Sequence, residues 1–154
     1  MKPQEFISKI AMAAQYAAQQ TGVPASISIA QAALESGWGE SGLTKAGNNL
    51  FGIKADSRWR GETLTFDTKE FLNGQWVVVP EKWRKYASWQ ASIEDHAAFL
   101  KCNPRYLACF QCVTPDAFVR ALAKAGYATD PIYAEKVIGV MSQHNLTTFD
   151  GGIK

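Results

Sequence analysis

The chain has 154 residues, of which 47% are hydrophobic and 19% charged, values ordinary for a single globular domain spanning about residues 1–150. Sixteen basic and fourteen acidic side chains leave a formal net charge of +2, too small to indicate a nucleic-acid partner. No run reaches the roughly 18 apolar residues of a membrane-spanning helix, so we expect no membrane partner. The composition indicates no cofactor.

Two helices are predicted before residue 40. Apolar residues recur at helical spacing in the first, which we expect to end near Thr21 and Gly22. Pro24 suits the first turn of the second helix, whose inward residues are Ile27, Ala30, Ala33 and Leu34. Gly37 and Gly39 end this helix, so Glu35 falls in its last turn.

The middle of the chain predicts a β hairpin. Residues 62–71 alternate and are rich in strand-forming side chains, and a second such run covers residues 75–79. Asn73 and Gly74 between them tolerate positive φ, which favours a tight turn. We expect Pro80 to end the second strand, giving a small β lobe at about residues 60–80.

Three further helices complete the pattern. The first covers Ser92–Leu100 and is broken at Asn103–Pro104, the next runs from Thr114 to Gly126, and Asp130–Pro131 opens the last. The predicted fold class is therefore α+β and mainly α: a helical bundle with one β-hairpin lobe.

Glu35 has the surroundings of a general acid. A carboxyl group must remain protonated near neutral pH to donate a proton to a glycosidic oxygen. The negative end of the helix dipole and the apolar neighbours Leu34 and Trp38 disfavour its charged form, and no Lys or Arg is adjacent in sequence. A solvated glutamate near a helix end is the plain alternative.

Three segments together resemble glycoside hydrolase family 73, the bacterial endo-β-N-acetylglucosaminidases. They are Gln31–Gly39 (QAALESGWG), Asn48–Lys54 (NNLFGIK) and Ala125–Ala134 (AGYATDPIYA), in the order that the family has. The resemblance spans nearly the whole chain. It implies a lysozyme-like fold in which the helical body and the β lobe flank a glycan groove.

The resemblance also implies catalytic residues. The family's catalytic glutamate corresponds to Glu35, and its functional tyrosine to Tyr127. Glu70, in Thr68–Phe71, is our choice for the second carboxylate, with Glu62 and Asp67 as alternatives. Strand alternation places Glu70 and Glu62 on one face and Asp67 on the other.

Five residues are expected to bind the substrate. Phe51 and Lys54 belong to the segment beneath the groove, and Asn49 is expected to bond the acid or an acetamido group. Trp38 and Tyr133 are expected in the groove wall, although both residue types are more often buried structural side chains. Of the five tryptophans, we expect at most two in the groove.

Cysteines are few and odd in number. Cys102, Cys109 and Cys112 allow at most one internal disulfide, and with His96 they offer the residue types of a zinc site. Their spacing matches no common zinc pattern, so buried structural thiols are the favoured interpretation and no metal is expected.

The sequence therefore predicts a monomeric enzyme that cleaves the β-1,4 bonds of peptidoglycan. A lytic transglycosylase or muramidase of the same fold is the alternative, and a non-catalytic wall-binding module is the alternative from another class. The N-terminus shows no signal-peptide pattern, so we expect synthesis in the cytoplasm and action on the periplasmic wall. That suits a phage lysin, or an interbacterial effector with a cognate immunity protein.

Overall fold

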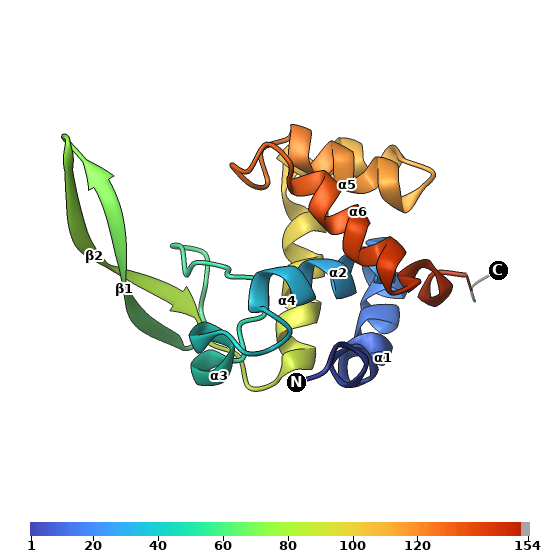
Figure 1. Ribbon diagram of the computed structural model, residues 1–154, viewed down its shortest axis with the longest axis horizontal. Coiled ribbons are helices and arrows are strands. Elements are labelled where there is room, and N and C mark those ends of the chain that lie inside the picture. Colours follow the sequence, from blue (N-terminus) through green and yellow to red (C-terminus); the bar gives the residue numbers. More distant parts are fainter. Residues whose placement is uncertain (152–154) are drawn as a thin grey trace.

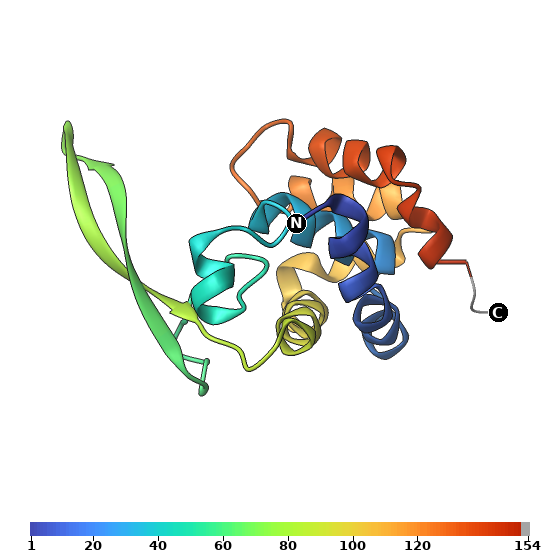
Figure 2. The same ribbon diagram turned by 60° about the horizontal axis from the view of Figure 1, so that its bottom comes forward.

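The computed structural model describes residues 1–151 as a helical body with one β hairpin projecting from its side (Figures 1 and 2). In chain order the elements are α1 (Pro3–Thr21), α2 (Ala25–Ser36), α3 (Gly42–Gly47), β1 (Thr63–Leu72), β2 (Gln75–Arg84), α4 (Trp89–Cys102), the 3₁₀ helix η1 (Pro104–Gln111), α5 (Pro115–Lys124), α6 (Tyr133–Gln143) and the 3₁₀ helix η2 (Leu146–Phe149). The predicted mainly α-helical α+β fold class is confirmed.

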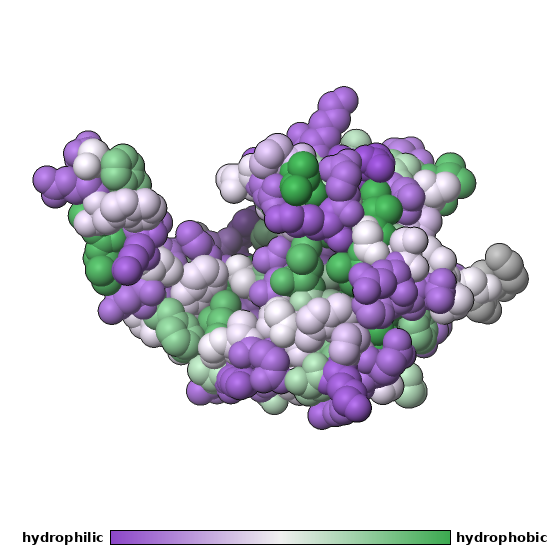
Figure 3. Space-filling model, viewed as in Figure 1, coloured by the Kyte–Doolittle hydropathy of each residue, from purple (hydrophilic) through white to green (hydrophobic). Residues whose placement is uncertain are grey.

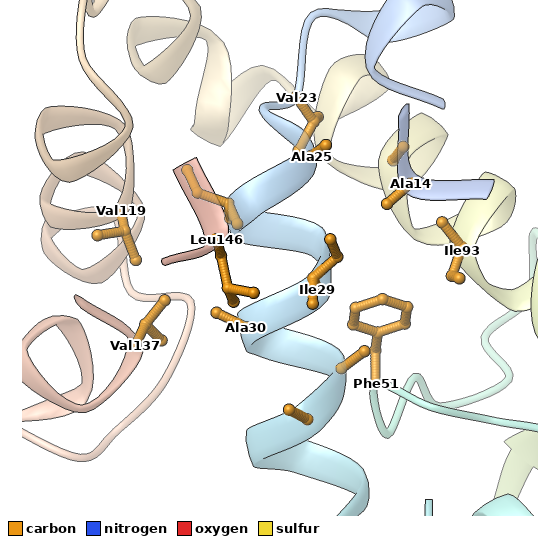
Figure 4. Close-up of a cluster of buried hydrophobic side chains, with 14 of the residues drawn as sticks. Ala14, Val23, Ala25, Ile29, Ala30, Phe51, Ile93, Val119, Val137 and Leu146 are labelled. Carbon is orange, nitrogen blue, oxygen red and sulfur yellow. The ribbon is translucent and has the colours of Figure 1, made fainter. Parts of the chain in front are cut away.

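Helix α2 runs through the centre of the core (Figure 4). It packs against α1, α6 and η2, and nearly all of its residues are buried, many of them alanines and serines. Val119 and Val137 lie on one side of it and Phe51 and Ile93 on the other. Small side chains let neighbouring elements approach closely, so the C-terminal end of α2, which carries Glu35, is held firmly by the core.

Some helix ends lie where the sequence predicted them and one does not. Helix α1 ends at Thr21, as predicted, with Gly22 at φ 87°, and α5 begins beside Thr114, whose hydroxyl accepts a hydrogen bond from the amide of Ala117 at 3.1 Å. The predicted start of α4 at Ser92 is wrong: Ser88 caps the helix, and the Ser92 hydroxyl accepts from the distant amide of Leu50 at 3.1 Å. Within residues 1–151, no helix has both the length and the apolar character needed to cross a bilayer.

Strands β1 and β2 form a two-stranded antiparallel sheet closed by the predicted turn. Asn73 and Gly74 both have positive φ, at 51° and 79°, as a tight hairpin turn requires. The prediction that Pro80 ends the second strand is wrong, since β2 continues to Arg84. Both strands of a two-stranded sheet are edges, where a residue without an N–H group is tolerated.

The hairpin is attached to the body at its base. Arg84 donates its backbone N–H to the carbonyl of Ile53 at 3.1 Å, and Ala55 donates to Lys82 at 3.0 Å. These bonds connect the last residues of β2 to the segment after Phe51. The rest of the hairpin extends away from the helices (Figure 1). The attachment at its base therefore determines the position of the hairpin, which forms one wall of the concave face.

Candidate active site

An open pocket of about 360 Å³ lies between the end of α2, the segment 51–56 and the loop from α5 to α6. Figure 3 shows the surface hollowed between the hairpin and the helical body. The lining residues are Glu35, Phe51, Gly52, Ile53, Lys54, Asp56, Phe99, Tyr106, Tyr127 and Ala128. Four residues expected in the site, Glu35, Phe51, Lys54 and Tyr127, therefore come together here.

Helix α2 ends one residue after Glu35 in an unusual turn. Gly37, Trp38 and Gly39 all have positive φ, at 58°, 58° and 84°, so the chain leaves α2 through three consecutive left-handed residues. The Ser36 hydroxyl bonds the carbonyl of Ala32 at 2.6 Å and accepts from the amide of Gly39 at 2.8 Å. This turn ends the helix at Ser36 and leaves the Glu35 side chain in the pocket.

The Glu35 side chain is open to the pocket, yet its pKa is raised. Partial desolvation by the surrounding walls raises the pKa of its carboxyl above the ordinary value, and the positive charge of Lys136 opposes this rise. The sequence showed no neighbouring cation, because Lys136 approaches only through the packing of α6 on α2. The apolar wall also differs from the expected one: Phe51 and Tyr127 line the pocket, whereas Leu34 and Trp38 do not.

Tyr127 and Tyr133 form an aromatic layer beside Glu35. Their rings lie 5.6 Å apart, and the negative charge of Glu35 contributes to a raised pKa in both, after burial. The Tyr127 hydroxyl lies 2.9 Å from Nε2 of His96, while the Tyr133 hydroxyl accepts from the Gln31 side chain at 2.9 Å. Tyr127 lines the pocket. Tyr133 is 3% exposed and belongs to the core, not to the groove surface.

Asn49 has a structural role rather than the expected contact with substrate. It is 1% exposed, and its side-chain amide donates to the carbonyls of Ile53 and Arg84 at 3.0 and 2.9 Å. Its carbonyl oxygen accepts from the amides of Gly52 and Ile53 at 2.9 and 3.1 Å. Because these bonds fully occupy it, Asn49 shapes the segment beneath the pocket without reaching it.

Trp38 likewise lies outside the pocket. Its ring packs edge-on against Phe6, with centroids 5.7 Å apart, and against His144, at 5.0 Å. A positive φ is uncommon for a bulky side chain and costs on the order of 1 kcal/mol. The aromatic contacts offset that cost, so Trp38 anchors the turn after Glu35. None of the five tryptophans lines the pocket.

Glu70 lies on the face of the hairpin that is turned toward the pocket. Residues directly opposite each other share a face, so Glu70, paired with Val77, lies on the same face as Glu81 and Trp83. Lys54, which lines the pocket, lies 3.7 Å from Glu81 and over the ring of Trp83. That contact identifies this face as the inner one, although Glu70 stands farther along the hairpin than the pocket lining reaches.

The two alternatives to Glu70 are placed differently. Asp67 pairs with Pro80 on the outer face of the hairpin, as the alternation predicted. Glu62 precedes β1, is exposed, and lies 3.8 Å from the ammonium of Lys85. Neither lines the pocket.

Glu81 is a second inner-face carboxylate that the sequence did not reveal. It is half-buried and pairs with Lys54 at the base of the hairpin. The sequence pattern hid it because the second strand was expected to end at Pro80. Only a strand that continues to Arg84 places residue 81 on the inner face.

A buried arginine joins the hairpin to the helices behind the pocket. Arg84 is 6% exposed, donates to Asp95 at 2.8 Å and donates to the carbonyl of Lys54 at 3.1 Å. Tyr86 donates its hydroxyl hydrogen to the same Asp95 carboxylate at 2.6 Å. These charge-assisted bonds fix the orientation of the hairpin base and of Lys54. No local pattern in the sequence indicated these bonds, because the partners lie on separate elements.

The residue types considered for zinc do not gather. Cys102, Cys109 and Cys112 are free thiols. His96 is buried, with its ring stacked on that of Phe51. Across the part of the chain that the structure describes, no group of three His, Cys, Asp or Glu side chains could hold a metal ion.

A second cavity, of about 250 Å³, lies between α1, η1 and α5. Its carboxyl, Asp150, is bonded to the backbone N–H of Ser26 at 2.9 Å and to the hydroxyl of the same residue. That carboxylate is occupied with joining η2 to α2, so this cavity offers no free acid.

The helical body, the hairpin and the groove with its acid at a helix end define a lysozyme-like glycoside hydrolase domain. The glucosaminidase family, described as mannosyl-glycoprotein endo-beta-N-acetylglucosaminidase, matches residues 11–146. The chain belongs to this family, glycoside hydrolase family 73, as the sequence motifs predicted.

Known relatives agree with this assignment. The chain is 39% identical over 142 residues to the peptidoglycan hydrolase FlgJ of Escherichia coli K12, a match covering 90% of the chain and 45% of FlgJ. It is 39% identical over 153 residues to a probable N-acetylmuramidase of Lactococcus lactis, covering 95% of the chain and 34% of that protein. The chain thus spans less than half the length of these relatives.

Among solved structures, the catalytic domain of the autolysin Auto from Listeria monocytogenes superposes with a TM-score of 0.87 at 36% identity. The match covers 96% of the chain and 87% of the Auto domain. The hairpin and the helical body therefore recur together in a relative determined by experiment.

Proposed function

We propose that this chain is a peptidoglycan hydrolase that cleaves the β-1,4 bonds of the N-acetylglucosamine and N-acetylmuramic acid strand, with Glu35 as the general acid. The observation that carries the proposal is the Glu35 carboxyl, which lies in an open pocket with a raised pKa beside Tyr127. A protonated carboxyl at the floor of a groove can donate its hydrogen to a glycosidic oxygen. The 39% sequence identity to a peptidoglycan hydrolase supports peptidoglycan as the substrate.

The other pocket residues suit an acidic glycan. Lys54 lines the pocket, and its ammonium group, 3.7 Å from Glu81, is placed to attract the carboxylate of muramic acid or of a peptide stem as well. Phe51 offers an apolar surface, and Tyr127 offers a hydroxyl for an acetamido group. Since the pocket is open rather than enclosed, we propose cleavage within the strand.

Glu70 is proposed as the second carboxylate. In an inverting reaction it would activate water, and in a retaining reaction it would act as the nucleophile. Carboxyl separations of about 6.5–9.5 Å and about 5–5.5 Å, respectively, distinguish the two courses in substrate-bound enzymes. Participation by the substrate's acetamido group is a third course, and the anomeric configuration of the first product separates inversion from the other two.

The proposed bond is the one on the reducing side of N-acetylglucosamine. The family description names glucosaminidases, whereas the Lactococcus relative is named a probable muramidase. Reduction and analysis of the new ends in digested peptidoglycan decides between them. Glucosamine ends support the proposal, muramic acid ends identify a muramidase, and anhydromuramic acid ends identify a lytic transglycosylase.

The test of the acid is Glu35→Gln, which keeps the size of the side chain and removes the proton donor. We expect release of soluble fragments from purified peptidoglycan to fall at least about 100-fold, as for loss of a general acid. Glu40→Gln, an exposed change on the far side of the turn, is the matched control and should retain activity. Unchanged digestion by Glu35→Gln would show that Glu35 is not the general acid. Binding of peptidoglycan without digestion by the unsubstituted chain would instead identify a wall-binding module.

We also propose that the chain, made in the cytoplasm, acts on the periplasmic wall of a host or target cell, as a phage lysin or a delivered effector. The open pocket supports this setting, because a loop of an inhibitor protein could enter it and protect a producing cell. Directing the chain to the periplasm of a test bacterium should cause lysis, whereas cytoplasmic expression should not. Co-expression of neighbouring gene products then distinguishes an inhibitor, which prevents lysis, from a holin, which promotes it.

A further inference from the structure

His96 is a buried histidine in direct contact with the pocket tyrosine. It lies on α4 with 0% of its surface exposed, and its ring stacks on Phe51 with centroids 3.8 Å apart and planes 4° apart. The Tyr127 ring meets it edge-on at 6.0 Å, and Nε2 lies 2.9 Å from the Tyr127 hydroxyl. Two residues that line the pocket, Phe51 and Tyr127, therefore both rest on this imidazole.

The two ring nitrogens of His96 differ sharply in their surroundings. Within residues 1–151, Nδ1 is buried without any hydrogen-bond partner, whereas Nε2 faces the Tyr127 hydroxyl. Burial lowers the pKa of His96 to about 3, so the ring is neutral across the range in which most enzymes work and carries a single N–H.

The position of that hydrogen decides what Tyr127 can do. With the hydrogen on Nδ1, a buried N–H would have no acceptor, and the phenol hydrogen of Tyr127 would be used on Nε2. With the hydrogen on Nε2, the N–H is bonded to the tyrosine oxygen and only a lone pair on Nδ1 is left unpaired. Buried N–H groups without partners are rarer in proteins than incompletely used acceptors.

We propose that His96 is a positioning residue that donates its Nε2 hydrogen to the Tyr127 oxygen and so leaves the phenol hydrogen free to be donated into the pocket. His96 thereby makes Tyr127 an obligatory donor toward the substrate acetamido group or the Glu35 carboxylate. The inference rests on the proposed function only for the identity of that acceptor. The hydrogen on Nε2 is a property of the folded chain without substrate.

The first test is the nitrogen-15 NMR spectrum of the folded chain labelled at histidine. The chain has two histidines, and His144→Gln assigns the signals of His96 by removing the others. We expect His96 to show a protonated Nε2, an unprotonated Nδ1, and no titration between about pH 5 and 8. A protonated Nδ1, an even mixture of the two tautomers, or an imidazolium at pH 6 would each overturn the proposal.

The second test is a double-mutant cycle on peptidoglycan hydrolysis. His96→Leu should lower kcat about tenfold, the loss expected for one positioned hydrogen bond. The same change should have no further effect when Tyr127 is already Phe, and His96→Gln, which restores an N–H donor, should recover part of the rate. Losses that multiply in the double variant contradict a role through Tyr127.

The two tests separate this proposal from the proposed function. Thermal unfolding shows which variants are folded, and only these enter the cycle. If the unsubstituted chain fails to digest peptidoglycan, the proposed function fails, while the NMR spectrum still decides where the His96 hydrogen resides.

Discussion

Lys54 and Glu81 face each other at the base of the hairpin, with Nζ of the lysine 3.7 Å from Oε1 of the glutamate. This ion pair connects the pocket floor to the inner face of the sheet, where Glu70 also lies. The inner face therefore carries two carboxylates in different electrostatic surroundings. Glu81 has a cation beside it, whereas the structure shows no ion pair for Glu70 within residues 1–151.

Substitution of these two glutamates distinguishes their roles. Glu70→Gln should lower kcat about 100-fold, because a water or sugar carbon would lose its activating carboxylate. Glu81→Gln should leave kcat within about threefold and change mainly KM, since it alters only the partner of Lys54. Steady-state kinetics on soluble glycan fragments measures both. A larger kcat loss for Glu81→Gln than for Glu70→Gln would reassign the second carboxylate.

The pH dependence of activity should respond to Lys136. The rate requires protonated Glu35, so it falls as the pH rises through the pKa of that carboxyl. Lys136 opposes the raised pKa. Lys136→Met should therefore raise this pKa further and move the basic limb of the pH profile to higher pH.

The matched control for Lys136 is Lys9→Met, which removes the same charge from an exposed position on α1. Its pH profile should superpose on that of the unsubstituted chain. A basic limb that stays in place in Lys136→Met would show that a group other than Glu35 limits the rate.

The hairpin base should depend on Arg84. Arg84→Met leaves the Asp95 carboxylate without its buried guanidinium partner, and we expect a loss of about 3 kcal/mol in the free energy of unfolding. Arg58→Met breaks an exposed pair with Asp56 and should cost less than about 1 kcal/mol. Urea denaturation compares the two, and equal losses would argue against a structural role for the Arg84 network.

The turn after Glu35 should not tolerate a side chain at residue 39. Gly39 has φ 84°, and an added Cβ would lie 2.9 Å from the Trp89 ring. Gly39→Ala should therefore destabilise the chain by about 2 kcal/mol or more and lower activity by displacing Glu35.

Gly139 provides the opposite case. It lies within α6, and a Cβ there would meet nothing within 4 Å. Gly139→Ala should stabilise the chain by up to about 1 kcal/mol, because alanine favours the helix. If Gly139→Ala also lowered the free energy of unfolding, the loss of stability in Gly39→Ala could not be assigned to crowding at residue 39.

The sequence predicted those parts of the site that depend on local pattern. The place of Glu35 in the last turn of α2 follows from apolar spacing and two glycines, and the hairpin follows from alternation around Asn73–Gly74. The direction of the Glu35 pKa shift was also predicted, but the side chains that line its pocket are Phe51 and Tyr127, which are distant in sequence, rather than Leu34 and Trp38. The helix end and the hairpin are each encoded in one continuous stretch of the chain.

The remainder of the site depends on contacts between distant segments. Asn49 was expected in the groove because its motif was visible, whereas its bonds to Ile53 and Arg84 were not. Trp38 and Tyr133 are motif residues that the fold uses for packing. The contact between His96 and Tyr127 joins α4 to the loop before α6, a pairing that no local pattern specifies.

The left-handed turn from Gly37 to Gly39 has a consequence for protein engineering. The helix that carries Glu35 ends one residue beyond it, at Ser36, and the next three residues all adopt positive φ, so the surroundings of the acid depend on this backbone conformation. Grafting the glutamate alone onto another helical bundle would therefore not reproduce its geometry. The transplantable unit is the pentapeptide Glu35–Gly39, together with a pocket for the Trp38 ring, and a recipient scaffold must supply both.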